Sequence, residues 1–439
     1  MKQFDLSIYE AVSQHLKKNP ISFHVPGHKN RLLTQEFQNI LDYDLTELTG
    51  LDDLHAPEEA IREAQEKLAV CYHTKESFFL VNGSTVGVLA MVFSCVEAGD
   101  HVFVQRNCHK SVFHALELVG ATPIFLAPEI DPDLHVPTGV HHTTLERAIT
   151  EYPDVRTVIF TYPNYYGCTY DVARLIERAH ANKLITLIDE AHGAHFIVGE
   201  PFPVSALTYG ADIVVQSAHK TLPAMTMSSF LHINSNRVSA DKVRKYLGML
   251  QSSSPSYPLM LSLDVARAYV ASYNKNDIEY CVEQIDGFCT ALTQIAGLEV
   301  IRTNDPIKVV LRTKGSGFAL QKALETEGIF AELADTHQVL FIMPLLKKGV
   351  FYPFDEALER IQRAMGNISI HEDIQMPIVM DEFIGKVAEE TIIPYPPGVP
   401  LIMKGEMITE EAIKELERLL VLGAKFQGGK KFQDIFMRK

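Results

Sequence analysis

The stretch Ser217-Ala218-His219-Lys220 (SAHK) directly follows the apolar segment Ala211–Gln216 (ADIVVQ). Upstream, Asp189 follows the apolar segment Leu184–Ile188 (LITLI) in the same way. A lysine after one buried strand and an aspartate after a neighbouring strand are the two groups that pyridoxal 5'-phosphate (PLP) most needs, an amine for the Schiff base and an anion for the pyridinium nitrogen. The pattern therefore predicts a PLP enzyme.

Predicted strands and helices alternate around this pair. Thr157–Tyr162 (TVIFTY) is short and apolar, as a buried strand is, and Asp171–Lys183 (DVARLIERAHANK) has the spacing of an amphipathic helix. Such alternation indicates parallel βαβ units, whose ligands bind at the carboxyl ends of the strands. Asp189 and Lys220 both fall there. Taken singly, each is equally well explained as a solvated loop residue, so it is their joint placement that favours a cofactor site.

Asn82-Gly83-Ser84-Thr85 (NGST) supplies a candidate seat for the cofactor phosphate. It stands between a predicted strand, Ser77–Val81, and a helical run that extends through Val96. Backbone N–H groups and hydroxyls at a helix N-terminus favour an anion. The same four residues are also ordinary helix punctuation. Their weight comes from lying upstream of the predicted aspartate and lysine.

Six motifs lie in order along nearly the whole chain: FHVPGHK (Phe23–Lys29), DLTELTGLDDLHAP (Asp44–Pro57), RNCHKS (Arg106–Ser111), DEAHGAHF (Asp189–Phe196), SAHK (Ser217–Lys220) and YPPGVPLIMKGEMITEE (Tyr395–Glu411). Together they resemble the bacterial ornithine/lysine/arginine decarboxylases, which are PLP enzymes of fold type I. The first and last motifs are not general PLP motifs, so the resemblance is specific. It implies an α/β fold-type-I PLP-dependent transferase-like large domain with a mostly parallel sheet, plus a smaller C-terminal α+β domain.

Carried over residue by residue, the resemblance implies a set of site residues. Lys220 would form the Schiff base, Asp189 would pair with the ring nitrogen, and His109, which follows a predicted strand at His101–Gln105, would stack on the ring face. The implied cofactor-binding residues are Ser84, Thr85, His109, Asp189, Ala191, His192, Ser217, His219 and Lys220. This chain departs from its relatives at His192, where the large members have an aromatic residue, and at Val86, where several relatives have a further hydroxyl.

The resemblance also implies the reaction, decarboxylation of a basic amino acid to the corresponding amine and CO2, as in polyamine biosynthesis. Arginine is slightly favoured over lysine and ornithine, because short relatives without the N-terminal wing domain are often assigned to it. We expect such a short form here, since the residues before Phe23 leave no room for a wing. Candidate acids for the cationic side chain are Asp52, Asp53 and Glu406, which the sequence alone does not place. The proton donor to Cα is left open.

Three other kinds of function remain to be weighed. An aminotransferase shares the cofactor core but commonly holds the substrate carboxylate with an arginine of the small domain. Phe341–Leu345 (FIMPL), at a predicted strand end, has no arginine, although Arg312 keeps this class open. A metal site of Asp189, His192 and His195 is disfavoured because the pattern is not HExxH. A non-enzymatic regulator is disfavoured because no helix-turn-helix module or basic face is evident.

Composition is that of a cytoplasmic enzyme. The chain has 439 residues, of which 46% are hydrophobic, enough for a large core divided into two domains. A net charge of −15 argues against nucleic acid and anionic membranes as partners. No apolar run approaches the roughly 20 residues that a membrane span needs, and Met1–Asn19 lacks a signal-peptide core. The six cysteines show no CxxC pair, so reduced thiols and no metal site are expected.

Three parts of the chain are predicted from these patterns. Residues 1–55 form an N-terminal arm, residues 56–265 the PLP-binding large domain, and residues 266–439 a connector helix with the C-terminal small domain. In that last part, strands are predicted at Lys308–Arg312 and Val339–Met343. Thr409 should cap a final helix.

Two segments suggest a shared active site in a homodimer or a higher homo-oligomer. Phe23–Lys29 and Gln251–Pro255 match family segments that lie where two subunits meet, although both could be simple surface turns. The basic tail Lys425–Lys439 is predicted to be a mobile or loosely docked end.

Overall fold

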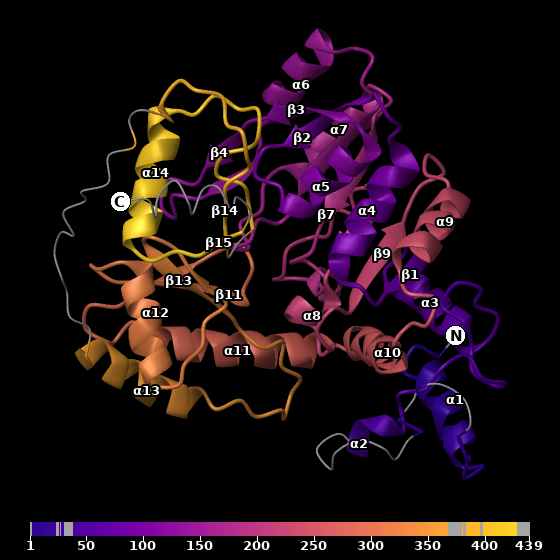
Figure 1. The fold of residues 1–439 in the computed structure, drawn as a ribbon. Helices are drawn as coiled ribbons and strands as arrows, with labels where there is room; N and C mark the ends of the chain where they lie inside the picture. Colours follow the sequence, from indigo (N-terminus) through magenta and orange to yellow (C-terminus); the bar gives the residue numbers. More distant parts are fainter. Residues whose placement is uncertain are drawn as a thin grey trace. The chain divides into compact units, whose positions relative to one another are not determined.

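The computed structural model describes residues 2–22, 26, 28–29, 38–367, 380, 383–395 and 398–427. The chain folds into two compact units, one of Met1–Asn164 and Thr169–Lys275, the other of Tyr165–Cys168 and Asn276–Lys439 (Figure 1). Most of the predicted arm motif Phe23–Lys29 and the tail beyond Gln427 lie outside the described residues.

A seven-stranded sheet forms the centre of the first unit, in the order β1-β9-β8-β7-β6-β2-β3. Its strands are β1 (Glu76–Leu80), β2 (His101–Gln105), β3 (Thr122–Leu126), β6 (Thr157–Thr161), β7 (Ile185–Asp189), β8 (Ile213–Gln216) and β9 (Ser229–Ile233). Only β9 runs antiparallel to its neighbours, β1 and β8, and the other pairs are parallel. The predicted mostly parallel sheet is confirmed. The carboxyl ends of the six parallel strands therefore share one edge.

Helices and a small hairpin complete the first unit. They are α1 (Ser7–Leu16), α2 (Gln38–Leu41), α3 (Ala60–Cys71), α4 (Gly83–Cys95), α5 (Lys110–Val119), α6 (His142–Glu151), α7 (Val172–Ala181), the 3-10 helix η2 (Phe196–Val198), α8 (Ala218–Thr221), α9 (Ala240–Leu250), α10 (Tyr257–Ala271), β4 (Pro128–Ile130) and β5 (Pro137–Val140). Gly87 lets α4 approach the sheet closely, since a Cβ there would lie 2.6 Å from Cδ1 of Leu80 and 3.0 Å from Cγ1 of Val215. The helix is therefore packed directly on β1 and β8.

A buried ion pair holds the start of the chain to the rest of the first unit. Arg267 on α10 is fully buried, and its Nη2 lies 2.7 Å from the Asp264 carboxylate. The same guanidinium donates to the Asp5 carbonyl at 2.9 Å, and Lys67 on α3 donates to that carbonyl at 3.2 Å. Buried cations are stable only when they are paired and hydrogen-bonded in this way. The segment before α1 is therefore fixed to α3 and α10.

The second unit is built on a four-stranded antiparallel sheet in the order β10-β11-β13-β12. Its elements are α11 (Lys275–Leu292), β10 (Glu299–Arg302), β11 (Lys308–Arg312), α12 (Gly317–Thr326), β12 (Leu333–Ala334), β13 (Gln338–Ile342), α13 (Phe354–Asn367), β14 (Ile393–Pro394), α14 (Glu410–Val421) and β15 (Phe426–Gln427). The predicted α+β class of this part is confirmed. The segment predicted as a helical connector is formed by two helices, since α10 ends at Ala271, with Ser272 as its C-cap, and α11 starts at Lys275.

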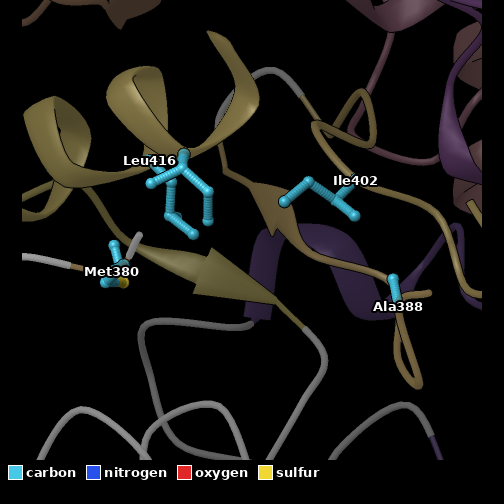
Figure 2. Close-up of a cluster of buried hydrophobic side chains, with 5 residues drawn as sticks. Met380, Ala388, Ile402 and Leu416 are labelled. Carbon is cyan, nitrogen blue, oxygen red and sulfur yellow. The ribbon is translucent and has the colours of Figure 1, made fainter. Parts of the chain in front are cut away.

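The C-terminal end of the second unit has a small core of its own. Met380, Ala388 and Ile402 are buried together with Ile413 and Leu416 of α14. Figure 2 shows Met380, Ala388 and Ile402 with Leu416 of that helix. The helix begins as predicted, since the Thr409 side chain accepts a hydrogen bond from the backbone N–H of Ala412 at 3.2 Å. Among the described helices of either unit, none has the length and apolar character needed to cross a membrane.

Candidate active site

All nine predicted cofactor residues lie at the carboxyl edge of the first unit's sheet. They are Ser84 and Thr85 after β1, His109 after β2, Asp189, Ala191 and His192 at and after β7, and Ser217, His219 and Lys220 after β8. Ligands of parallel sheets bind at this edge because loops from several strands converge there. The order of the strands thus brings together segments that are more than a hundred residues apart in sequence.

Asp189 ends β7 and is buried, with 4% of its surface exposed. One carboxylate oxygen accepts a hydrogen bond from the backbone N–H of Ala191 at 3.2 Å, the only hydrogen bond to this carboxylate among the described residues. Burial raises the pKa of Asp189, while the charge of Lys220 and the Ala191 N–H act to lower it. A buried carboxylate with so few donors is suited to a cationic partner from outside the chain.

Lys220 lies on the short helix α8, and its Nζ is 2.9 Å from Nε2 of the buried His192. A backbone hydrogen bond joins the two loops, since the N–H of Ser217 donates to the Ala191 carbonyl at 3.2 Å. Within the loop after β8, the N–H of Lys220 donates to the Ser217 carbonyl at 3.1 Å. The loops that follow β7 and β8 therefore form one connected structure, with the amine and the imidazole in direct contact.

His109 is the N-cap of α5. Its Nδ1 accepts from the backbone N–H of Ser111 at 3.3 Å and lies 2.8 Å from the Ser111 hydroxyl. Burial lowers the pKa of His109 to about 3, and the charge of Lys220 adds to the effect. Because Nδ1 accepts, the proton of this neutral ring is on Nε2. A neutral aromatic ring at this edge is suited to stacking on another flat ring.

Two buried serine hydroxyls at this edge lack a hydrogen-bond partner in the described part of the chain, Oγ of Ser217 and Oγ of Ser229. Ser229 pairs with Leu80 at the end of β1, and the next residue, Phe230, pairs with Gln216 on β8. Unsatisfied buried hydroxyls are rare and call for a ligand. The donors at the start of α4 and these hydroxyls fit a phosphate group.

Sequence reasoning missed Ser229 because β9 joins the sheet between two strands that are distant in the chain. The two hydroxyls that it assigned to the phosphate from the NGST turn differ in accessibility: Ser84 is half-buried and Thr85 is exposed. A pair of small polar residues at each end of the β9 segment, Ser228-Ser229 and Asn234-Ser235, is the sequence signal that points to Ser229, and it is weak.

Glu190 was also missed, although it stands in the quoted DEAHGAHF motif. It is fully buried, and its carboxylate accepts from Gln216 Nε2 at 3.2 Å, from Ser205 Oγ at 3.1 Å and from the Ala206 N–H at 2.9 Å. Burial raises the pKa of Glu190 to about 8, and the three donors limit the rise. The side chain links the end of β7 to the end of β8, directly beside Asp189.

The charged residues considered for substrate contacts form hydrogen bonds within the chain instead. Asp52 accepts hydrogen bonds from five backbone N–H groups at 2.9 to 3.2 Å, four of them at the start of α3, so it acts as a helix cap. Arg312 donates to Gln338 at 2.6 Å within the sheet of the second unit. Asp53 accepts from the His55 N–H at 2.8 Å and Glu406 from the Met403 N–H at 2.8 Å, both within local turns.

Comparison with known families covers most of the chain. The family model described as Orn/Lys/Arg decarboxylase, major domain, matches residues 7–314, and the one described as Orn/Lys/Arg decarboxylase, C-terminal domain, matches residues 349–429. The fold agrees with a solved structure as well. The crystal structure of the Francisella novicida lysine decarboxylase LdcF is similar with a TM-score of 0.79 at 19% identity, over 97% of this chain and 79% of that one.

Two relatives match the chain nearly end to end. The uncharacterized protein YaaO of Bacillus subtilis (strain 168) is 46% identical over 97% of this chain and 97% of its own length. An arginine decarboxylase of the same organism is 32% identical over 98% of this chain and 96% of its own length. The chain thus belongs to the Orn/Lys/Arg decarboxylase family and is a PLP-dependent decarboxylase of fold type I.

Proposed function

We propose that this protein decarboxylates arginine to the corresponding amine and CO2. The observation that carries the choice of substrate is the 32% identity with an arginine decarboxylase over 98% of the chain. The similar lysine decarboxylase structure is only 19% identical. A net charge of −15 also favours a cationic substrate over an anionic one. Lysine and ornithine are the alternatives within the same family.

We propose the following roles for the residues at the carboxyl edge. Lys220 holds the cofactor covalently through Nζ, and Asp189 accepts a hydrogen bond from the ring nitrogen and keeps its proton in place. His109 stacks on the ring as a neutral imidazole, and Ala191 packs beneath it. The phosphate is held by the start of α4, with Ser84 and Thr85, and by Ser217 and His219.

When bound, PLP supplies the electron sink that takes up the electron pair left by departing CO2. The chain must then deliver a proton to the substrate Cα and keep water away from the reacting bond. Once released from the cofactor, Lys220 Nζ is the candidate donor, because His192 Nε2, 2.9 Å away, can restore its proton. Burial of Asp189 and His192, each 4% exposed, restricts water at this point.

The assembly, the location and the extent of the functional parts are further proposals. We propose a homodimer or higher homo-oligomer in the cytoplasm, with a role in polyamine biosynthesis and with Gln251–Pro255 and the arm motif near the partner's site. The division into residues 1–55, 56–265 and 266–439 stays a prediction. Limited proteolysis of the PLP-loaded protein, with mass spectrometry of the fragments, tests these boundaries.

The substrate is tested by measuring CO2 release from arginine, lysine and ornithine with the purified PLP-loaded protein. We expect the highest kcat/KM for arginine. A higher value for lysine or ornithine would leave the family assignment intact and overturn the choice of arginine. Transfer of the amino group to a 2-oxo acid without CO2 release would instead indicate an aminotransferase.

A further inference from the structure

A strained turn follows the lysine that we assign to the cofactor. Its four residues, Met225 to Ser228, are closed by a hydrogen bond from the Ser228 N–H to the Met225 carbonyl at 3.0 Å. Met227, at the third position, has φ +79°, and Thr226 has no positive φ. This is the geometry of a type II turn, whose third position favours glycine. A methionine there keeps a conformation that its side chain disfavours.

The carbonyl of Met227 faces the start of α4. It accepts a hydrogen bond from the N–H of Gly83 at 2.8 Å. Gly83 itself has φ +76° and is the first residue of α4, so its orientation determines where the next N–H groups point. These N–H groups are the proposed phosphate donors. The strained turn therefore holds the proposed phosphate seat in place.

Ser228, the next residue of the turn, is hydrogen-bonded to the segment that carries Lys220. The Ser228 carbonyl accepts two hydrogen bonds from His219, one from its backbone N–H at 3.1 Å and one from Nδ1 at 2.9 Å. Since a carbonyl can only accept, Nδ1 carries the proton and the ring orientation is defined. One turn thus contacts both the start of α4 and the residue next to Lys220.

Helix α10 also fixes this turn. The backbone N–H of Met225 donates to Oγ of Ser262 at 3.2 Å, and the Ser228 hydroxyl lies 2.9 Å from the same oxygen. Ser228 is fully buried, whereas Met225 and Met227 are 43% and 44% exposed. The backbone of the turn is therefore restrained even though its two methionine side chains are exposed.

We propose that the Met225–Ser228 turn is a positioning element for PLP, in which the disfavoured backbone of Met227 aims two successive carbonyls. The Met227 carbonyl holds the start of α4, and the Ser228 carbonyl holds the segment of His219 and Lys220. This rests on the proposed assignment of these segments to the cofactor. The alternative is that Met227 is an incidental strained surface residue. Lys183 provides a matched control, because it also has a positive φ, +61°, and lies in the turn before β7 at the opposite edge of the sheet.

The test measures PLP affinity and the thermal midpoint of the apo-protein for Met227→Gly and Met227→Val, with Lys183→Gly and Lys183→Val as controls. Glycine accepts φ +79°, so Met227→Gly should keep the dissociation constant of PLP within about threefold and leave the apo-protein folded. Valine is branched at Cβ and opposes this conformation, so Met227→Val should weaken PLP binding about tenfold or more. Both Lys183 variants should bind PLP like the wild type.

Equal PLP affinity in Met227→Val and Lys183→Val would overturn the inference. If Met227→Val does not fold, Ser262→Ala decides, since it removes the hydroxyl that holds the turn while Met227 stays in place. A several-fold loss of PLP affinity with little change in the apo-protein midpoint supports the proposal, and unchanged affinity contradicts it. A wild-type protein that does not bind PLP would overturn the proposed cofactor site itself, and this inference with it.

Discussion

Two buried aspartates, Asp189 and Asp212, belong to neighbouring strands but lie at opposite edges of the same sheet. Asp189 ends β7 at the carboxyl edge, and Asp212 precedes β8 at the amino edge. The carboxylate of Asp212 accepts hydrogen bonds from the backbone N–H and hydroxyl of Thr186, from His180 Nε2, from Ser235 Oγ and from Arg237 Nη1. Asp189 accepts one, from Ala191, within the described part of the chain.

The pKa values of the two carboxyl groups shift in opposite directions, although burial acts to raise both. Burial acts to raise the pKa of Asp212, but its donors outweigh burial and the pKa is lowered. At Asp189 burial prevails and the pKa is raised. At the amino edge, the chain's own donors satisfy the Asp212 carboxylate, which serves stability. At the carboxyl edge, the described residues give the Asp189 carboxylate a single donor, so a ligand is needed to complete its contacts. This contrast leads to five predictions that would break or sharpen it.

The largest effect is expected at the carboxyl edge for Lys220→Ala. The variant should lose the visible absorbance of the lysine-bound cofactor and more than about a thousandfold in kcat, because no other described residue takes the place of this amine. Lys183→Ala, at the amino edge, should do neither. Absorbance spectra and CO2 release measure both variants, and an unaltered cofactor spectrum in Lys220→Ala would refute the assignment of the lysine.

A pH-dependent effect is expected from Glu190, beside Asp189. Its pKa rises from 4.5 to about 8 on folding, so between these values the folded state holds a proton that the unfolded state has released. The free energy of unfolding should therefore fall as pH rises through this window, by up to about 5 kcal/mol. In Glu190→Gln, this decrease of the unfolding free energy with rising pH should disappear. Urea unfolding of both apo-proteins across the window between the two pKa values checks this, and parallel profiles would contradict it.

A smaller loss of stability is expected at the amino edge for Asp212→Asn. Its donors, including Arg237, lose a charged acceptor, which should cost about 1 to 3 kcal/mol of unfolding free energy. The folded variant should keep its kcat, because Asp212 is remote from the edge where the cofactor residues lie. If kcat fell in a variant of unchanged stability, the division of roles between the edges would be wrong.

The smallest effects concern the unpartnered hydroxyls. Ser217→Ala and Ser229→Ala should each weaken PLP binding about three- to tenfold and leave the apo-protein as stable as the wild type, since neither hydroxyl has a partner among the described residues to lose. Ser235→Ala removes a donor to Asp212, so it should destabilise the apo-protein and leave PLP binding unchanged. Titration of apo-protein with PLP distinguishes the two patterns, and equal losses of affinity in all three variants would argue against a phosphate seat.

The parallel strands that carry the site residues could largely be predicted from local sequence patterns. The strand at His101–Gln105 was predicted with the bounds that it has, and β7 and β8 within a residue or two, because continuous apolar runs bounded by polar residues mark buried parallel strands. The antiparallel position of β9 between β1 and β8 could not be predicted, since strand pairing depends on residues distant in sequence. With it, Ser229 and the turn before β9 were missed.

The site residues, too, divide into those that local motifs predict and contacts that only the folded structure shows. Motif spacing led to Asp189, Lys220 and His109, but the contact of Lys220 with His192 requires side-chain directions that a sequence does not contain. Asp52 shows the opposite error, since an acidic residue in a family motif was considered for the substrate and is a helix cap. The roles of the arm motif Phe23–Lys29 remain predictions.

Asp189→Asn tests most directly the claim that the carboxyl edge sacrifices stability for a ligand. The measurement compares this variant with the wild type in PLP occupancy, in kcat with the preferred amino acid and in the unfolding free energy of the apo-protein. We predict that PLP is retained, that kcat falls about 100- to 1000-fold because the ring nitrogen is no longer held protonated, and that the apo-protein is at least as stable as the wild type. A near-normal kcat, or an apo-protein destabilised as strongly as Asp212→Asn, would contradict the account.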